Sequence, residues 1–177
     1  SYSVTGVQTC ALPISPEYIE SLGGQWVFTD KPYRFSSNVF TTGVIERTTD
    51  FEKPPAFKIR LNGKIVDDPF DDDLTLCVRT RKGVVAISGC AHAGIVNILR
   101  HIQKQTRGEK IAGVFGGAHL GHESADRIAK TIDVFREMAI PTLGLTHCTG
   151  VKVMAQIARE LPGQFDYVNA GNVRTIR

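Results

Sequence analysis

VVAISGCAHAG, residues 84–94, is the stretch that decides the fold. Its apolar run ends at Ser88 and Gly89. A short cluster around His92 follows, and apolar residues at helical spacing begin at Ile95. This order predicts a buried strand, a tight turn and a helix. A histidine held at a strand end by a glycine-rich turn is rigidly placed, and α/β proteins carry much of their chemistry at such positions.

The same plan occurs twice more downstream. Residues 114–120, VFGGAHL, predict a strand, a turn and His119, and residues 143–150, LGLTHCTG, predict a strand followed by His147. A single histidine after a strand is more often a structural hydrogen-bonding residue than a metal ligand. Parallel strands, however, deliver their carboxyl ends to one edge of a sheet. The pattern therefore predicts that His92, His119 and His147 converge, and imidazole suits zinc, iron or manganese.

The composition limits the class of protein. The 177 residues are 42% hydrophobic and 22% charged, which is typical of one globular domain with a real core. The net charge of +3 is too small to argue for a nucleic-acid partner. No apolar run approaches the roughly 18 residues of a membrane helix. The four cysteines, at positions 10, 77, 90 and 148, lack paired spacing, which favours a reducing, cytoplasmic compartment.

Residues 1–14, SYSVTGVQTCALPI, differ from the rest of the chain. They carry no charge, and they lack the basic start and the longer apolar core of a signal peptide. Residues 4–14 look like the translation of a sequencing-library adaptor. We interpret residues 1–14 as a non-native segment and place the start of the natural chain near Ser15. A disordered natural terminus is the alternative.

The remaining pattern predicts strands first and then an alternation of strands and helices. A short helix begins at Ser15, and one helix follows each of the three histidine turns. The Asn62-Gly63 pair predicts a hairpin, and Gly43 within a strand predicts a bulge or a close backbone approach. The other predicted strands include residues 25–29, 39–46, 74–79, 84–88, 165–168 and 173–176.

An acidic cluster in residues 67–73 is interpreted as a solvated turn. A second hypothesis is that Asp72 or Asp73 orients a ligand histidine, since carboxylates often support metal ligands in this way. His101 is predicted to be a surface residue of the helix that follows His92. His122, just before the next helix, is assigned to a solvent-exposed or capping role in preference to a further ligand.

These motifs resemble those of the metallo-β-lactamase superfamily. The similarity lies in SGCAHAGIVN (88–97), GGAHL (116–120) and THCTG (146–150), in this order and spacing. Within the superfamily they resemble the branch related to the dihydropteroate synthase of the methanopterin pathway, as do TGVIER (42–47) and TDFE (49–52). The resemblance covers about residues 15–177. It implies the C-terminal portion of an αββα sandwich of the α/β class, with two sheets face to face and helices outside.

The resemblance also implies roles for the histidines. His92 matches a position that binds the first metal, and His147 matches one that binds the second. His119 stands near a point where many members have a bridging aspartate, so it either binds metal or faces the substrate. Cys90 and Cys148 have no ligand role in the resemblance and are interpreted as small residues that pack under the turns. The expected cofactor is a divalent metal, zinc first, with iron or manganese as alternatives.

One motif of the family is absent from the sequence. Complete members carry an upstream His-x-His-x-Asp-His motif that supplies most of the first metal shell, and it occurs nowhere in these 177 residues. We therefore expect residues 15–177 to be an N-terminally truncated metallo-β-lactamase domain that is inactive alone.

The resemblance implies an activity for the parent protein. It would join a hydroxymethyl-dihydropterin diphosphate to an aminobenzene ribofuranosyl phosphate, so its partners would be small pterin-like or phosphate-bearing molecules, with no nucleic acid and no membrane. The alternative within enzymes is a metal-dependent hydrolase of an ester or phosphoester. The alternatives from another class are a metal-free module that binds a small ligand and an orphan fragment without function.

Overall fold

The computed structural model describes residues 15–176, which belong to two compact units. The smaller contains the described residues up to Thr29 together with Ala56–Pro69, and the larger contains Asp30–Pro55 and the described residues from Phe70 onward. The interpretation of residues 1–14 as non-native lies outside the described residues. Within the described part of the chain, no helix is long and apolar enough to cross a membrane.

The smaller unit contains a short helix and a hairpin. Helix α1 (Pro16–Ser21) begins as predicted, because the Ser15 hydroxyl accepts a hydrogen bond from the Tyr18 N–H at 3.2 Å. Strands β2 (Lys58–Leu61) and β3 (Lys64–Asp67) pair antiparallel across the predicted Asn62-Gly63 turn. The strand predicted at residues 25–29 is wrong, because this segment has no regular secondary structure and Phe28 is exposed.

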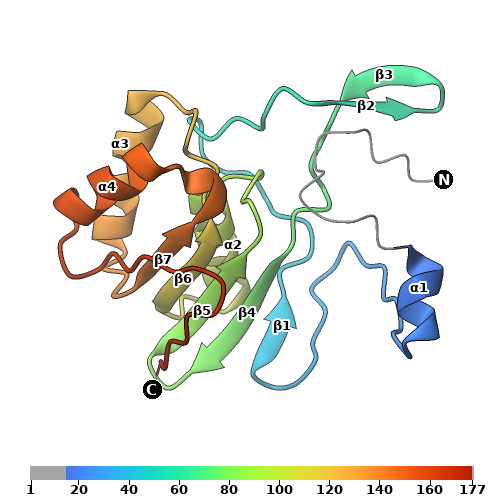
Figure 1. Ribbon diagram of the computed structural model, residues 1–177, viewed down its shortest axis with the longest axis horizontal. Helices are drawn as coiled ribbons and strands as arrows, with labels where there is room; N and C mark the ends of the chain where they lie inside the picture. The colour runs from blue at the N-terminus through green and yellow to red at the C-terminus, as the bar shows by residue number, and fades with distance from the viewer. Residues whose placement is uncertain (1–14, 177) are drawn as a thin grey trace. The chain divides into compact units, whose positions relative to one another are not determined.

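The larger unit contains a five-stranded sheet of order β1-β4-β5-β6-β7 (Figure 1). Its strands are β1 (Val39–Thr41), β4 (Thr75–Thr80), β5 (Gly83–Ser88), β6 (Ile111–Gly117) and β7 (Leu143–Thr146). Its helices are α2 (Ile95–Gln105), α3 (Ala125–Glu137), α4 (Val151–Glu160) and the 3₁₀ turn η1 (His147–Thr149). Pairing is antiparallel from β1 to β5 and parallel from β5 to β7. The predicted parallel arrangement of the three histidine-bearing strands is therefore confirmed.

The core lies between the sheet and its three long helices. In β5 the alternate residues Val84 and Ala86 belong to this core, as does Cys77 of β4. The predicted apolar stripe of α2 is fully buried, and its members are Ile95, Ile98, Leu99 and Ile102. Burying each such side chain contributes about 1.5–3 kcal/mol. This packing fixes the start of α2, and therefore the turn before it, against the sheet.

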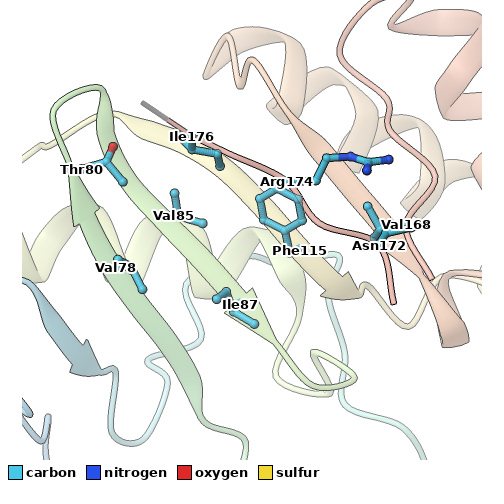
Figure 2. A pocket seen from close by; sticks show the side chains of 9 residues that line it. All are labelled: Val78, Thr80, Val85, Ile87, Phe115, Val168, Asn172, Arg174 and Ile176. Carbon is cyan, nitrogen blue, oxygen red and sulfur yellow. The ribbon is translucent and has the colours of Figure 1, made fainter. Parts of the chain in front are cut away.

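The opposite face of the sheet carries a groove of ≈ 390 Å³ (Figure 2). Apolar side chains of three neighbouring strands line it, among them Val78, Ile87 and Phe115. The C-terminal segment 168–176 lines the groove with side chains such as Arg174, but it is not a strand. The two closing strands predicted there are wrong, since the sheet is joined in this region through a single bridge from Leu143 to Phe165. None of the predicted metal ligands lines this groove.

Strand β1 is shorter than the predicted strand at residues 39–46. The chain leaves the sheet at Gly43, whose φ of 66° is left-handed. A Cβ atom at Gly43 would lie 2.7 Å from the backbone oxygen of Asp30. The predicted close backbone approach is confirmed, and it turns the chain away from β4 toward the loop that reaches α2.

Candidate metal centre

The ends of β5 and β6 are joined tightly at the edge where the histidines lie. The Ser88 hydroxyl donates a hydrogen bond to the backbone oxygen of Gly117 at 3.0 Å, and the Gly117 N–H donates to the oxygen of Gly89 at 2.9 Å. Gly116 has a φ of 117°, and a Cβ atom there would lie 2.1 Å from the backbone oxygen of Ser88. Only glycine fits this close approach, which explains the Gly116-Gly117 pair before His119.

A second set of hydrogen bonds joins the end of β6 to the turn after β7. The Ala118 N–H donates to the Thr149 hydroxyl at 3.0 Å, and the Gly121 N–H donates to the backbone oxygen of Cys148 at 3.1 Å. The three predicted turns therefore form one connected framework, and the side chains on it have little freedom to move independently.

Three non-glycine residues of this framework have a left-handed backbone. They are Ala91 with φ 57°, His119 with φ 48° and His147 with φ 53°. Such conformations cost on the order of 1–3 kcal/mol each and persist where the surrounding structure holds them. Two of the three predicted ligands are thus held in a strained backbone, which is a frequent property of functional sites.

His92 and His119 lie side by side. Their ring centroids are 4.6 Å apart at an interplanar angle of 86°, and the His92 ring is 4.8 Å from Phe70. The Nδ1 atom of His119 is buried, and no described residue forms a hydrogen bond with it. Burial, followed by the charges of His92 and Arg127, lowers the pKa of His119 to about 4. His119 is therefore neutral at pH 7, with a lone pair available, and this fits a metal ligand.

Asp73 lies beneath the His92 turn. One of its carboxylate oxygens accepts a hydrogen bond from the Ala93 N–H at 2.8 Å. Burial raises the pKa of Asp73, while the Ala93 hydrogen bond and the charges of His92 and Arg47 act against this rise. Asp72 is exposed. Of the two carboxylates considered for orienting a ligand histidine, Asp73 is the one that contacts the turn carrying His92, through the backbone N–H of Ala93.

His147 lies at the exposed rim, in the company of two thiols. One nitrogen of His147 and the sulfurs of Cys90 and Cys148 all lie within 4.8 Å of one another. Among residues 15–176 this is the one group of three potential metal donors at such mutual distances. His147 also lies near enough to His119 for its charge to lower the pKa of that residue. The structure therefore joins His92 to His119, and joins His147 to the cysteines.

The two other histidines of the region differ in burial. His122 is exposed, as expected. The prediction that His101 is a surface residue is wrong, because it is half-buried and its Nδ1 accepts a hydrogen bond from the Glu46 N–H at 3.2 Å. Its other nitrogen lies 3.3 Å from the Thr42 oxygen. His101 therefore attaches the segment after β1 to α2.

Two polar residues with important roles near the site were missed by the sequence analysis. Glu52 is 3% exposed, and its carboxylate accepts hydrogen bonds from the N–H groups of Val96 and Asn97 at 2.9 and 2.7 Å. It therefore caps α2. The fully buried Asn97 amide accepts from the N–H groups of Thr48 and Thr49 at 2.7 and 2.9 Å. Gly94 at the N-cap of α2 has no side-chain oxygen. That absence was the available signal that the cap comes from elsewhere in the chain.

Comparison with known proteins identifies the class. The 7,8-dihydropterin-6-methyl-4-(β-D-ribofuranosyl)-aminobenzene-5′-phosphate synthase of Methanocaldococcus jannaschii is 35% identical over 162 residues, which are 89% of this chain and 55% of that protein. A second protein of that organism, MJ0448, is 28% identical over 144 residues, or 81% of this chain and 52% of its own length. No protein-family model matches the chain.

The comparison of structures agrees. The crystal structure of Tm1679, described as a metal-dependent hydrolase of the β-lactamase superfamily, matches with a TM-score of 0.74 and 36% identity. The match covers 84% of this chain and 57% of that one. The fold is thus that of the metallo-β-lactamase superfamily, to which the chain belongs. Within it, the chain falls in the branch of the M. jannaschii synthase. It spans about half the length of the curated relatives that it matches.

Proposed function

We propose that the chain is part of a metal-dependent enzyme whose centre includes His92, His119 and His147. The observation that carries this proposal is the buried Nδ1 of His119, which has no hydrogen-bond partner among residues 15–176 and lies beside His92. Leaving a buried polar atom unpaired costs about 1–3 kcal/mol, a cost that a bound cation would remove. The expected ion is zinc, with iron or manganese as alternatives, since all three accept imidazole.

At the edge of the sheet that carries the histidines, the bound ion and the protein residues would have different roles. When bound, such an ion polarises a phosphoryl or carbonyl oxygen and lowers the pKa of bound water. The protein holds its donors in place through the hydrogen-bonded framework around Ser88 and Gly117. Asp73 fixes the backbone that follows His92. Because its pKa is about 4, His119 stays neutral and does not repel a cation at neutral pH.

The proposed reaction is a transfer like that named for the M. jannaschii synthase. An arylamine nitrogen of an aminobenzene ribofuranosyl phosphate forms a bond to the methylene carbon of a hydroxymethyl-dihydropterin diphosphate. The bond between that carbon and the diphosphate oxygen breaks, diphosphate leaves, and the arylamine loses one proton. The sequence match over 89% of this chain supports the assignment.

A hydrolase is the second candidate. The structural neighbour Tm1679, which is 36% identical, is described as a metal-dependent hydrolase. In that case water would replace the arylamine as the attacking group, and an ester or phosphoester would be cleaved. The two candidates require the same donors at the strand ends and differ in the nucleophile.

Product analysis separates the two candidates. We expect the metal-loaded parent protein, of which this chain is a part, to release diphosphate from the pterin substrate only when the arylamine is present, and mass spectrometry to find the joined product. Release that does not require the arylamine would identify a hydrolase. An Asn172→Ala variant, changed in the groove on the opposite sheet face, is the control and should match the wild type. Turnover that is equal with and without a chelator would contradict both candidates.

A further inference from the structure

Two cysteines from distant parts of the sequence meet at the candidate metal centre. Cys90 follows β5, and Cys148 lies in η1 after β7. Both are half-buried, and the Cys148 thiol donates a hydrogen bond to the backbone oxygen of Cys90 at 3.4 Å. Their sulfurs and one nitrogen of His147 all lie within 4.8 Å of one another. The proposed function uses His147 but leaves both thiols without a role.

The surrounding backbone makes room for the Cys148 sulfur. A Cβ atom at Gly117 would lie 2.5 Å from this sulfur, so any other residue at that position would displace it. The same Cβ atom would also lie 2.8 Å from the backbone oxygen of Gly89, so the close approach of the two strand ends requires glycine here as well. The Cys148 sulfur therefore occupies space that a side chain at position 117 would fill.

A cation would bind these sulfurs as thiolates, because metal ions deprotonate the thiols that coordinate them.

The distances suit a tetrahedral ion. Zinc bonds of about 2.3 Å to sulfur and about 2.0–2.1 Å to nitrogen place neighbouring ligand atoms roughly 3.5–3.8 Å apart. Atoms that now lie within 4.8 Å of one another need to close by only about 1 Å, a shift within reach of side-chain rotation. Thiolates select zinc and similar ions over magnesium and calcium, which prefer oxygen ligands.

We propose that Cys90, Cys148 and His147 form a sulfur-containing site for a thiophilic divalent cation such as zinc, next to His92 and His119. Three protein ligands leave a fourth position open, as in catalytic zinc sites. The site goes beyond the proposed function, because it recruits two residues which that function does not use. It also stands whether or not His92 and His119 hold an ion of their own.

Cobalt titration of the reduced 177-residue chain tests this site. Thiolate ligands give Co²⁺ an intense near-ultraviolet charge-transfer band that histidine ligands do not give. We expect this band in the wild type and in the His92→Ala, His119→Ala double variant. We expect the Cys90→Ser, Cys148→Ser double variant to lose the band and at least ~100-fold in zinc affinity, since even loss of an outer-shell partner costs 10–100-fold. Cys77→Ala, which removes a core thiol outside the group, is the matched control and should keep the band.

A second measurement uses the unaltered chain, in case the double serine variant does not fold. One equivalent of zinc should slow alkylation of Cys90 and Cys148 in the native chain, as followed by peptide mass spectrometry. Cobalt binding without the charge-transfer band, together with unprotected thiols, would overturn the sulfur site and leave the histidine proposal standing. Absence of any cobalt binding by the folded chain would overturn both.

Discussion

The His92→Ala, His147→Ala double variant is expected to lose bound metal that the wild-type chain retains through purification. Each replacement removes a ligand from a different part of the proposed centre: His92 beside His119, and His147 beside the two thiols. Replacing an outer-shell partner alone lowers metal affinity 10–100-fold, so removing two ligands should lower it by at least ~1,000-fold. Elemental mass spectrometry of both proteins, purified in parallel, measures the difference.

His122→Ala is the matched control for this measurement. His122 is exposed and lies near His119, yet it belongs to no group of three donors among the described residues. Its replacement should leave the metal content unchanged. Metal that stays at full occupancy in the double variant would refute the proposed ligands. A folded wild-type chain that binds no metal would instead favour the metal-free ligand-binding module.

The convergence of the histidines was predictable because it follows from local rules. An apolar run, a glycine-rich turn and an amphipathic helix, repeated with His92 and His119, require a right-handed crossover between parallel neighbours. Parallel strands then bring their carboxyl ends to one edge. The structure confirms this order for β5, β6 and β7. The role of Gly116 was not predicted: it allows the end of β6 to approach the backbone of Ser88 closely.

The features that escaped prediction depend on contacts between distant residues. Cys90 and Cys148 are 58 positions apart, and only the folded chain brings their sulfurs together. The family resemblance gave neither cysteine a ligand role, so each was predicted to be a small packing residue. The strands predicted at residues 165–168 and 173–176 have suitable residues, but the segment they belong to follows the groove beside Phe115 and does not extend the sheet. Strand propensity indicates a fit to a pleated surface and does not supply a neighbour to pair with.

Glu52→Ala is expected to lower the free energy of unfolding by about 3 kcal/mol. Its carboxylate accepts hydrogen bonds from the N–H groups of Val96 and Asn97 at the start of α2. The Thr49 hydroxyl donates a further hydrogen bond to it at 3.3 Å. Alanine would leave these donors buried and unpaired, at about 1–3 kcal/mol each, partly offset because the buried carboxylate no longer needs to be desolvated. For a domain of this size the melting temperature should fall by roughly 6–12 °C.

The matched control is a carboxylate on the surface. Glu46, in the segment after β1, forms an ion pair with Lys104 of α2, but both side chains are largely exposed. Exposed pairs contribute little to stability, so Glu46→Ala should shift the urea midpoint far less than Glu52→Ala does. Equal shifts for the two variants would mean that Glu52 does not cap α2 in solution.

The Glu52→Gln variant adds a test of protonation. Burial raises the pKa of Glu52 above its ordinary value of 4.5, against the pull of the hydrogen bonds from Val96 and Asn97. Between 4.5 and the raised pKa, the folded chain holds a proton that the unfolded chain has released. The contribution of Glu52 to the free energy of unfolding therefore falls as pH rises through this window. Glutamine does not titrate. The free energy of unfolding of the wild type minus that of Glu52→Gln should therefore fall as pH rises through the same window. Urea unfolding of both proteins from pH 4.5 upward measures this quantity. If the wild type instead gains stability relative to Glu52→Gln as pH rises, the hydrogen bonds from Val96 and Asn97 outweigh burial.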